Sequence, residues 1–227
     1  PCADGDPVRV TSRRGSIEWL VDDFERRVAR FAWPTVARLA AGDLDGDGLG
    51  ALVVLRGGAP DTVPAALLTR GATAPAGGGA GPAFVESAVA TGGPGPFVAG
   101  ALLDADSDGD LDAILAAGAQ DRLLVGDGFG HLLDATAGAL PVDWSAGGDV
   151  AVADFDLDGN PDVVIGNRGA TDRLYLGRGD GRFTDATPDF GFDDLDTAAV
   201  IVADLDGDGD DDVVSFPASG AAKPLVR

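Results

Sequence analysis

The stretch that decides the fold is Asp154-Phe155-Asp156-Leu157-Asp158-Gly159-Asn160-Pro161-Asp162, which runs directly into Val163-Val164-Ile165. It places carboxylates at positions 1, 3, 5 and 9 of a nine-residue loop. Position 6 is glycine, which allows a sharp bend because it tolerates positive φ. The backbone carbonyl of Asn160, at position 7, adds a further oxygen. Ca²⁺ takes about six to eight oxygen ligands in flexible geometry, so this loop predicts a calcium site.

The same loop recurs along the chain. Complete copies start at Asp104 and Asp204, and a partial copy starts at Asp43, with Ala51 where the ninth-position carboxylate is expected. The first aspartates are 61, 50 and 50 residues apart, which indicates an internal repeat. Fewer ligand charges lower the affinity for calcium, so we expect three sites and a weaker fourth at Asp43. The predicted ligands are Asp43, Asp45, Asp47, Leu49 (through its carbonyl), Asp104, Asp106, Asp108, Asp110, Asp112, Asp154, Asp156, Asp158, Asn160, Asp162, Asp204, Asp206, Asp208, Asp210 and Asp212.

An EF-hand is the rival interpretation of these loops, and two features argue against it. An EF-hand needs a bidentate glutamate at position 12 and a helix on either side. Position 12 is occupied here by Val54, Leu115, Ile165 and Ser215. The flanking segments are short and rich in valine, which favours strands. The sequence therefore predicts a unit of strand, calcium loop and strand.

A second similarity defines the rest of the repeat. Residues 121–136 align without gaps on residues 172–187, and each segment has two short apolar runs around a glycine-rich turn, which predicts a hairpin. One repeat then has four strands, A to D, with the calcium loop between A and B. Four strands in about 50 residues is typical of a β-propeller blade. We predict an all-β propeller of four-stranded blades in a single domain, 1–227, with strand A innermost and repeats at 36–91, 97–137, 148–187 and 198–216.

The chain resembles the FG-GAP/VCBS repeats of integrin α-subunit propellers and of many bacterial surface proteins. The resemblance rests on the four aspartate loops, on the hairpin at residues 173–187 and on Gly58-Ala59-Pro60, and it covers roughly residues 30 to 216. It implies a propeller with Ca²⁺ ions in the A–B loops. Propellers of this family usually have seven blades, whereas this chain has four such loops.

The two ends of the chain suggest how the blades are completed. Two strands are predicted at Val8–Thr11 and Ser16–Val21, and the last repeat ends with a B strand at Val213–Phe216. We predict that the N-terminal strands complete the last blade and close a four-bladed ring, which would protect its edges. Two alternatives stay open. The strands could complete a blade of a neighbouring molecule and build a filament of subunits, or the chain could be a fragment of a larger propeller.

Charge and composition exclude several functions. The net charge of −22 argues against nucleic-acid binding, because phosphate contacts need basic patches, and nearly half of the 38 acidic residues lie in the loops. No run is apolar enough to span a membrane. The close carboxylate pairs lie in the loops, where Ca²⁺ would keep both ionised and unable to act as a general acid. His131 is the only histidine, and no nucleophile motif accompanies it. We therefore predict that the protein is not an enzyme.

Two tryptophans are candidates for partner binding. Trp33 and Trp144 each precede the first aspartate of a loop by ten residues, which places them on the face opposite the loops. Aromatic side chains there could stack on sugar rings or anchor a protein, although packing between blades is an alternative. The predicted function is an extracellular or cell-surface calcium-binding propeller with a structural or adhesive role and a protein or glycan partner. A lectin and a strand-exchanged surface filament are the alternatives.

Overall fold

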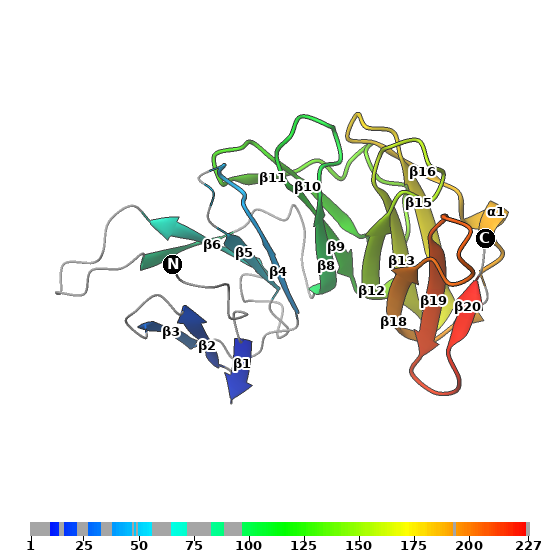
Figure 1. The fold of residues 1–227 in the computed structure, drawn as a ribbon, viewed down its shortest axis with the longest axis horizontal. Helices are drawn as coiled ribbons and strands as arrows, with labels where there is room; N and C mark the ends of the chain where they lie inside the picture. Colours follow the sequence, from blue (N-terminus) through cyan, green and yellow to red (C-terminus); the bar gives the residue numbers. More distant parts are fainter. Residues whose placement is uncertain are drawn as a thin grey trace.

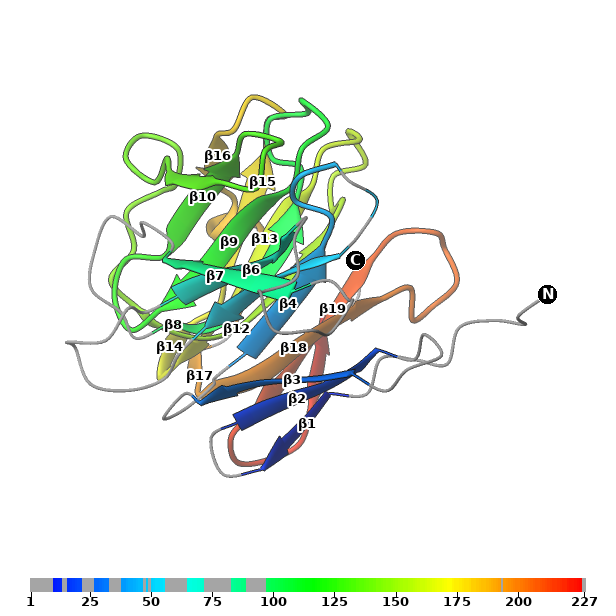
Figure 2. The ribbon, with the colours of Figure 1, turned by 90° about the vertical axis from the view of Figure 1, so that its left-hand side faces the viewer.

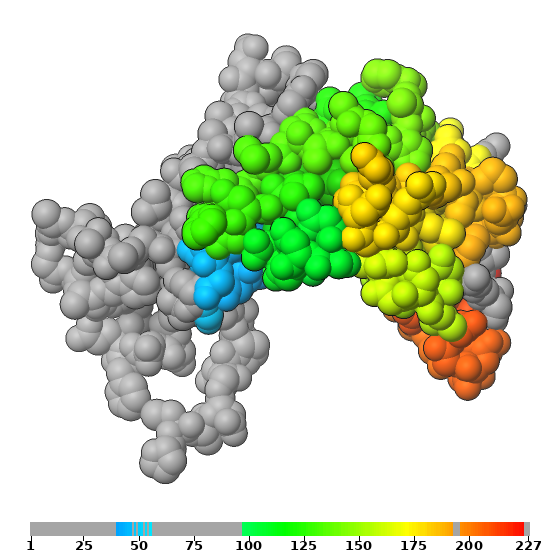
Figure 3. All heavy atoms as spheres, turned by 90° about the horizontal axis from the view of Figure 1, so that it is seen from above, coloured from blue at the N-terminus to red at the C-terminus, as the bar shows by residue number. Residues whose placement is uncertain are grey.

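The computed structural model describes residues 10–13, 16–21, 27–32, 38–46, 48, 50–55, 65–71, 83–88, 97–192 and 194–225. These residues form antiparallel sheets with a single short helix. The sheets follow one another in chain order along an arc, from β4 and β5 to β18 and β19 (Figures 1 and 3). The architecture is all-β and propeller-like, as the sequence predicts.

Three sheets have the predicted four strands, hydrogen-bonded in the order A, B, C, D. Their strands are β4 (Arg38–Gly42), β5 (Ala51–Leu55), β6 (Ala65–Gly71) and β7 (Ala83–Ala88); β8 (Phe97–Leu103), β9 (Asp112–Ala117), β10 (Arg122–Gly126) and β11 (Leu132–Asp134); and β12 (Ala146–Ala153), β13 (Asp162–Arg168), β15 (Arg173–Gly177) and β16 (Phe183–Asp185). The two hairpins predicted from the gapless alignment are the pairs β10–β11 and β15–β16.

A fourth sheet of the same kind has three strands: β18 (Thr197–Ala203), β19 (Asp212–Pro217) and β20 (Lys223–Leu225). The sequence did not predict β20. Three smaller elements, one helix and two short strands, lie outside these four sheets. The helix α1 (Thr187–Phe190) ends at Gly191, and β14 (Ala170–Thr171) pairs with β17 (Asp194–Leu195).

The predicted N-terminal strands are present as β1 (Val10–Arg13) and β2 (Ser16–Val21), and they form a separate sheet with β3 (Arg27–Ala32). Among the described residues, this sheet has no strand pairing with β18–β20. It lies at the β4–β7 end of the molecule (Figures 1 and 2). Closure of the ring by these strands therefore stays a prediction.

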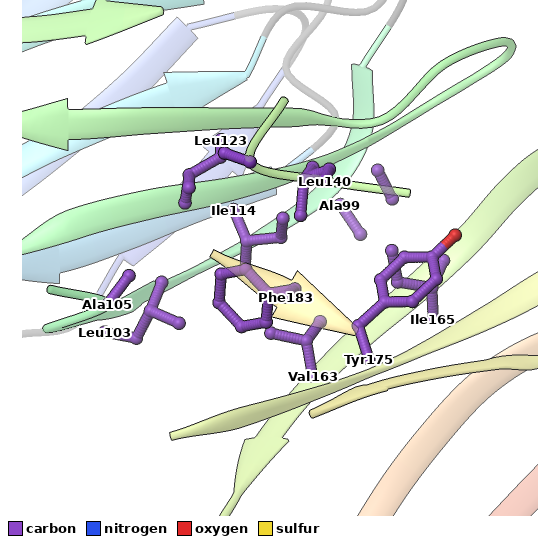
Figure 4. Packing of buried hydrophobic residues seen from close by; sticks show 12 residues of the cluster. Ala99, Leu103, Ala105, Ile114, Leu123, Leu140, Val163, Ile165, Tyr175 and Phe183 are labelled. Atoms are coloured by element: carbon purple, nitrogen blue, oxygen red, sulfur yellow. The ribbon is translucent and has the colours of Figure 1, made fainter. Parts of the chain in front are cut away.

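The hydrophobic core lies between successive sheets. Side chains of the second and third sheets point toward one another in Figure 4, where Ile114 and Leu123 face Val163 and Phe183. Every residue of β9 is buried, as expected for a strand packed on both faces. Similar clusters join the first sheet to the second and the third to the fourth.

The A strands of successive sheets contact one another, the arrangement expected if strand A is innermost. Small residues permit this close approach. A Cβ on Gly148 of β12 would overlap the carbonyl oxygen of Thr197 in β18, and a Cβ on Gly42 of β4 would lie 2.8 Å from Cδ1 of Leu102 in β8. Among the described residues, no helix has the length and apolarity needed to cross a lipid bilayer.

Candidate metal centre

Each of the four loops is closed by the same hydrogen bond. The carboxylate at position 1 accepts from the backbone N–H of the glycine at position 6, and all four glycines have positive φ, between +81° and +98°. The N···O distances are 2.8 Å for Gly48 to Asp43, 3.1 Å for Gly109 to Asp104, 2.9 Å for Gly159 to Asp154 and 3.2 Å for Gly209 to Asp204. The role predicted for this glycine is confirmed.

Position 4 also has left-handed backbone geometry, which sequence reasoning missed. Two loops have glycine there, Gly46 and Gly207, but the others have Ser107 at φ 58° and Leu157 at φ 60°. Residues other than glycine rarely adopt this geometry. The glycines at two of the four positions were the only signal in the sequence that could have revealed this bend.

Carboxylates converge in three of the loops. In each, one oxygen from each of three aspartates lies within 4.8 Å of the others. The triads are Asp104, Asp106 and Asp108; Asp154, Asp156 and Asp162; and Asp204, Asp206 and Asp212. The first loop forms no such triad among its described residues, and the predicted ligands Asp47 and Leu49 lie outside them.

The second loop contains buried carboxylate oxygens that a bound cation would neutralise. Oδ1 of Asp104 and Oδ1 of Asp106 are buried without a hydrogen-bond partner, and so is Oδ1 of Asp43 in the first loop. An unpartnered buried polar atom costs about 1–3 kcal/mol, and more when it is charged. Burial and repulsion from Asp108 and Asp104 raise the pKa of Asp106. A divalent cation would satisfy these oxygens and favour the ionised form, so the residues fit a bound metal ion.

Position 9 has a structural role that the sequence did not reveal. Asp162 is fully buried; its Oδ2 accepts from the N–H of Phe155 at 2.7 Å and its Oδ1 from the N–H of Gly177 at 2.7 Å. Asp112 makes the same two contacts in the second sheet, at 2.7 and 2.8 Å. Burial raises the pKa of both carboxyls to about 6, although these N–H groups oppose the shift. Position 9 thus joins the loop to strand C of its own sheet.

The remaining predicted ligands form turns at the loop surface. At position 7, the backbone N–H of Asp110, Asn160 or Asp210 donates to Oδ1 of the aspartate two residues earlier, at 2.9, 2.8 and 3.0 Å. Their side chains are not part of the triads. Asp158 and Asp208, at position 5, also lie outside the triads of their loops.

Trp144 is 74% exposed and lies before β12, at the opposite end of that strand from the calcium loop. The segment that carries it is fastened through the buried Asp143. This carboxylate accepts from Nε of Arg173 at 2.9 Å and from the N–H and hydroxyl of Ser145 at 3.0 and 2.8 Å, and the N–H of Asp143 donates to Gln120. Burial alone would raise the pKa of Asp143, but these contacts lower it overall. Trp33 lies outside the described residues.

Comparisons with known proteins support this architecture. A family model described as an FG-GAP-like repeat matches residues 104–165 and, overlapping them, residues 154–215; each match spans two of the aspartate loops. The chain is similar to the crystal structure of BBS1N in complex with ARL6DN, soaked with lead, with 12% identity and a TM-score of 0.53 over 84% of this chain and 53% of that chain. It thus spans about half of the BBS1N chain, and at this identity the likeness shows the fold alone.

A second solved structure has a lower TM-score. The V. cholerae biofilm matrix protein Bap1 matches with 18% identity and a TM-score of 0.44, over 83% of this chain and 30% of that chain. No curated protein sequence matches the chain.

Proposed function

We propose that this protein is a calcium-stabilised, non-enzymatic β-propeller that acts outside the cell in structure or adhesion. The observation that carries the proposal is the convergence of three aspartate triads, each with oxygens within 4.8 Å. The unpartnered buried oxygens of Asp104 and Asp106 support it, because buried charged groups in proteins are paired or coordinate metals.

The ligand set favours Ca²⁺ over other common metals. Carboxylate and carbonyl oxygens suit hard cations, whereas Zn²⁺, Cu²⁺ and Ni²⁺ favour sites with imidazole or thiolate. Mg²⁺ requires near-octahedral geometry and usually keeps several waters, whereas Ca²⁺ tolerates flexible loops with many protein oxygens. Extracellular calcium modules bind at about 10⁻⁴–10⁻³ M, so exposed loops of this kind suit the outside of a cell.

Thermal unfolding tests the proposal. A ligand that binds only the folded state stabilises it by about 2.7 kcal/mol per site at a hundredfold excess over Kd. Three sites would contribute about 8 kcal/mol, which corresponds to about 15–30 °C in Tm for a chain of this size. We expect EGTA to lower Tm by this amount, and Ca²⁺ but not Mg²⁺ to restore it. A melting curve that EGTA leaves unchanged would contradict the proposal.

A second candidate function is glycan binding through Trp144. The observation that favours it is a largely exposed indole on a segment held by hydrogen bonds to Asp143, because a backbone that is already ordered lowers the entropy cost of binding. A glycan array probed with the calcium-loaded protein tests it. Binding that Trp144→Ala abolishes would support a lectin. The control is Phe129→Ala, which removes an aromatic side chain that is 82% exposed; an equal loss in this variant would contradict the assignment.

A further inference from the structure

The glycine-rich turns of two hairpins lie between neighbouring calcium loops. We call residues 126–130 and 177–181 the linking turns. In the second of them, the N–H of Gly177 donates to Oδ1 of Asp162 in the loop of its own sheet, at 2.7 Å. At the other end, the N–H of Gly181 donates to the carbonyl oxygen of Ala105 at 3.0 Å. Ala105 belongs to the calcium loop of the preceding sheet, so one turn bonds to two loops.

The residue that accepts this bond, Ala105, lies within the metal site. Ala105 stands between the triad members Asp104 and Asp106. Its carbonyl is held by the linking turn, and its N–H donates to Oδ2 of Asp112 at 2.7 Å. Hydrogen bonds therefore run from the position-9 aspartate of the third loop, through the turn, to the position-9 aspartate of the second.

The arrangement occurs twice. In the first linking turn, the N–H of Gly126 donates to Oδ1 of Asp112 at 2.8 Å, and the N–H of Gly130 donates to the carbonyl oxygen of Leu44 at 3.1 Å. Leu44 occupies the same loop position as Ala105. In the first loop, Ala51 stands in place of the position-9 aspartate, so this loop has no position-9 carboxylate to continue the series of hydrogen bonds.

The second linking turn is also packed tightly against both loops. A Cβ on Gly179 would overlap Oδ1 of Asn160 in the third loop and would lie 3.2 Å from Oγ of Ser107 in the second. A Cβ on Gly181 would lie 3.4 Å from Cβ of Asp106. The turn therefore has little room to move without displacing residues of a metal loop.

We propose that the linking turn 177–181 couples the second and third calcium loops, so that a cation in either loop raises the affinity of the other. The proposal rests on the calcium binding proposed above. A cation in the third loop would fix Asp162 and, through Gly177, the turn. The turn would then hold the Ala105 peptide in place between two ligands of the second loop. The entropy cost of ordering the shared turn is incurred only once, which gives positive cooperativity.

Hydrogen exchange measured by mass spectrometry resolves the two loops in the full chain. Exchange in peptides covering 104–112 and 154–162 is followed as CaCl₂ is added, which gives a separate calcium midpoint for each. Asp156→Asn weakens calcium binding by the third loop. We expect this variant to raise the calcium midpoint of peptide 104–112 about fivefold or more, and fivefold is the lower end of typical coupling. Because coupling is reciprocal, Asp106→Asn should raise the midpoint of 154–162 by the same factor.

A second substitution tests whether the turn carries the coupling. Gly181 has φ 74°, so Gly181→Ala strains the turn and weakens its bond to Ala105. In this background, Asp156→Asn should no longer shift the midpoint of 104–112. The matched control is Gly138→Ala, which places the same strain at φ 83° where nothing lies within 4 Å of the new Cβ; this variant should retain the shift.

The outcomes distinguish a failure of the proposed coupling from a failure of the proposed calcium binding. A midpoint for 104–112 that Asp156→Asn leaves unchanged would overturn the coupling and leave calcium binding intact. A shift that persists undiminished in Gly181→Ala would also overturn the role of the turn. If calcium protects neither peptide in the wild-type protein, both the coupling and the proposed function are wrong.

Discussion

Replacing Asp162 with alanine tests whether the position-9 carboxylate stabilises its sheet independently of calcium. Asp162 is fully buried and accepts two backbone hydrogen bonds of 2.7 Å, from Phe155 and Gly177. The substitution leaves both N–H groups without this acceptor, at about 1–3 kcal/mol for each buried donor. Removing a buried charge relieves its desolvation and opposes this loss. We therefore expect the free energy of unfolding to fall by about 2–4 kcal/mol, short of the full sum of about 2–6 kcal/mol.

The assay is urea unfolding in EGTA, so that no metal contributes. The control is Asp158→Ala, which removes an exposed carboxylate from the same loop and should cost less than about 1 kcal/mol. The slope of unfolding against urea should stay the same in both variants, because a similar surface becomes exposed. If the two variants are equally stable in EGTA and differ only in Ca²⁺, Asp162 acts through the metal alone and the reasoning is refuted.

Three further substitutions test other parts of the structure. Ala51→Asp restores the missing carboxylate of the first loop, and calorimetric titration should show tighter calcium binding; an unchanged isotherm would count against a weak first site. Burial raises the pKa of Asp121 to about 7, so the protonated form is favoured on folding, and stability is lost as the pH rises from about 4 to about 7. When unfolding is measured across that pH range, Asp121→Asn should reduce the loss of folding stability by about 4 kcal/mol. An unaltered dependence of stability on pH would show that Asp121 is not the group responsible. Phe155→Ala, at a buried position 2, should cost about 3–5 kcal/mol, whereas Leu205→Ala, at the same loop position but 49% exposed, should cost less than about 1 kcal/mol; equal losses would show that position 2 does not pack the sheets together.

Local patterns in the sequence predicted much of the fold. The aspartate spacing and the glycine at position 6 belong to one short segment, so the loop geometry follows from residues close together in the chain. The gapless alignment of 121–136 with 172–187 likewise predicted both hairpins, because a hairpin is set by its own turn. The first loop could be distinguished from the others because Ala51 replaces a carboxylate.

Features that depend on distant residues could not be predicted in this way. The acceptor role of Asp162 toward Gly177 joins residues 15 positions apart, and the bond from Gly181 to Ala105 joins two sheets. Ser107 and Leu157 are ordinary residue types, so nothing in their identity reveals the left-handed geometry that the surrounding loop imposes. The separate sheet of β1–β3 depends on pairing with β3, which the sequence patterns did not reveal.

The hydrogen bonds through the linking turns also bear on how the protein responds to force. Because the turns connect the first three loops in series, tension between the first and third sheets would act on these short backbone contacts. The second, third and fourth loops start 50 residues apart, so a sheet that comes free and then unravels completely would lengthen the chain by at most about 165–180 Å. If the loops hold calcium, the ion concentration around the protein would set the tension at which this extension begins.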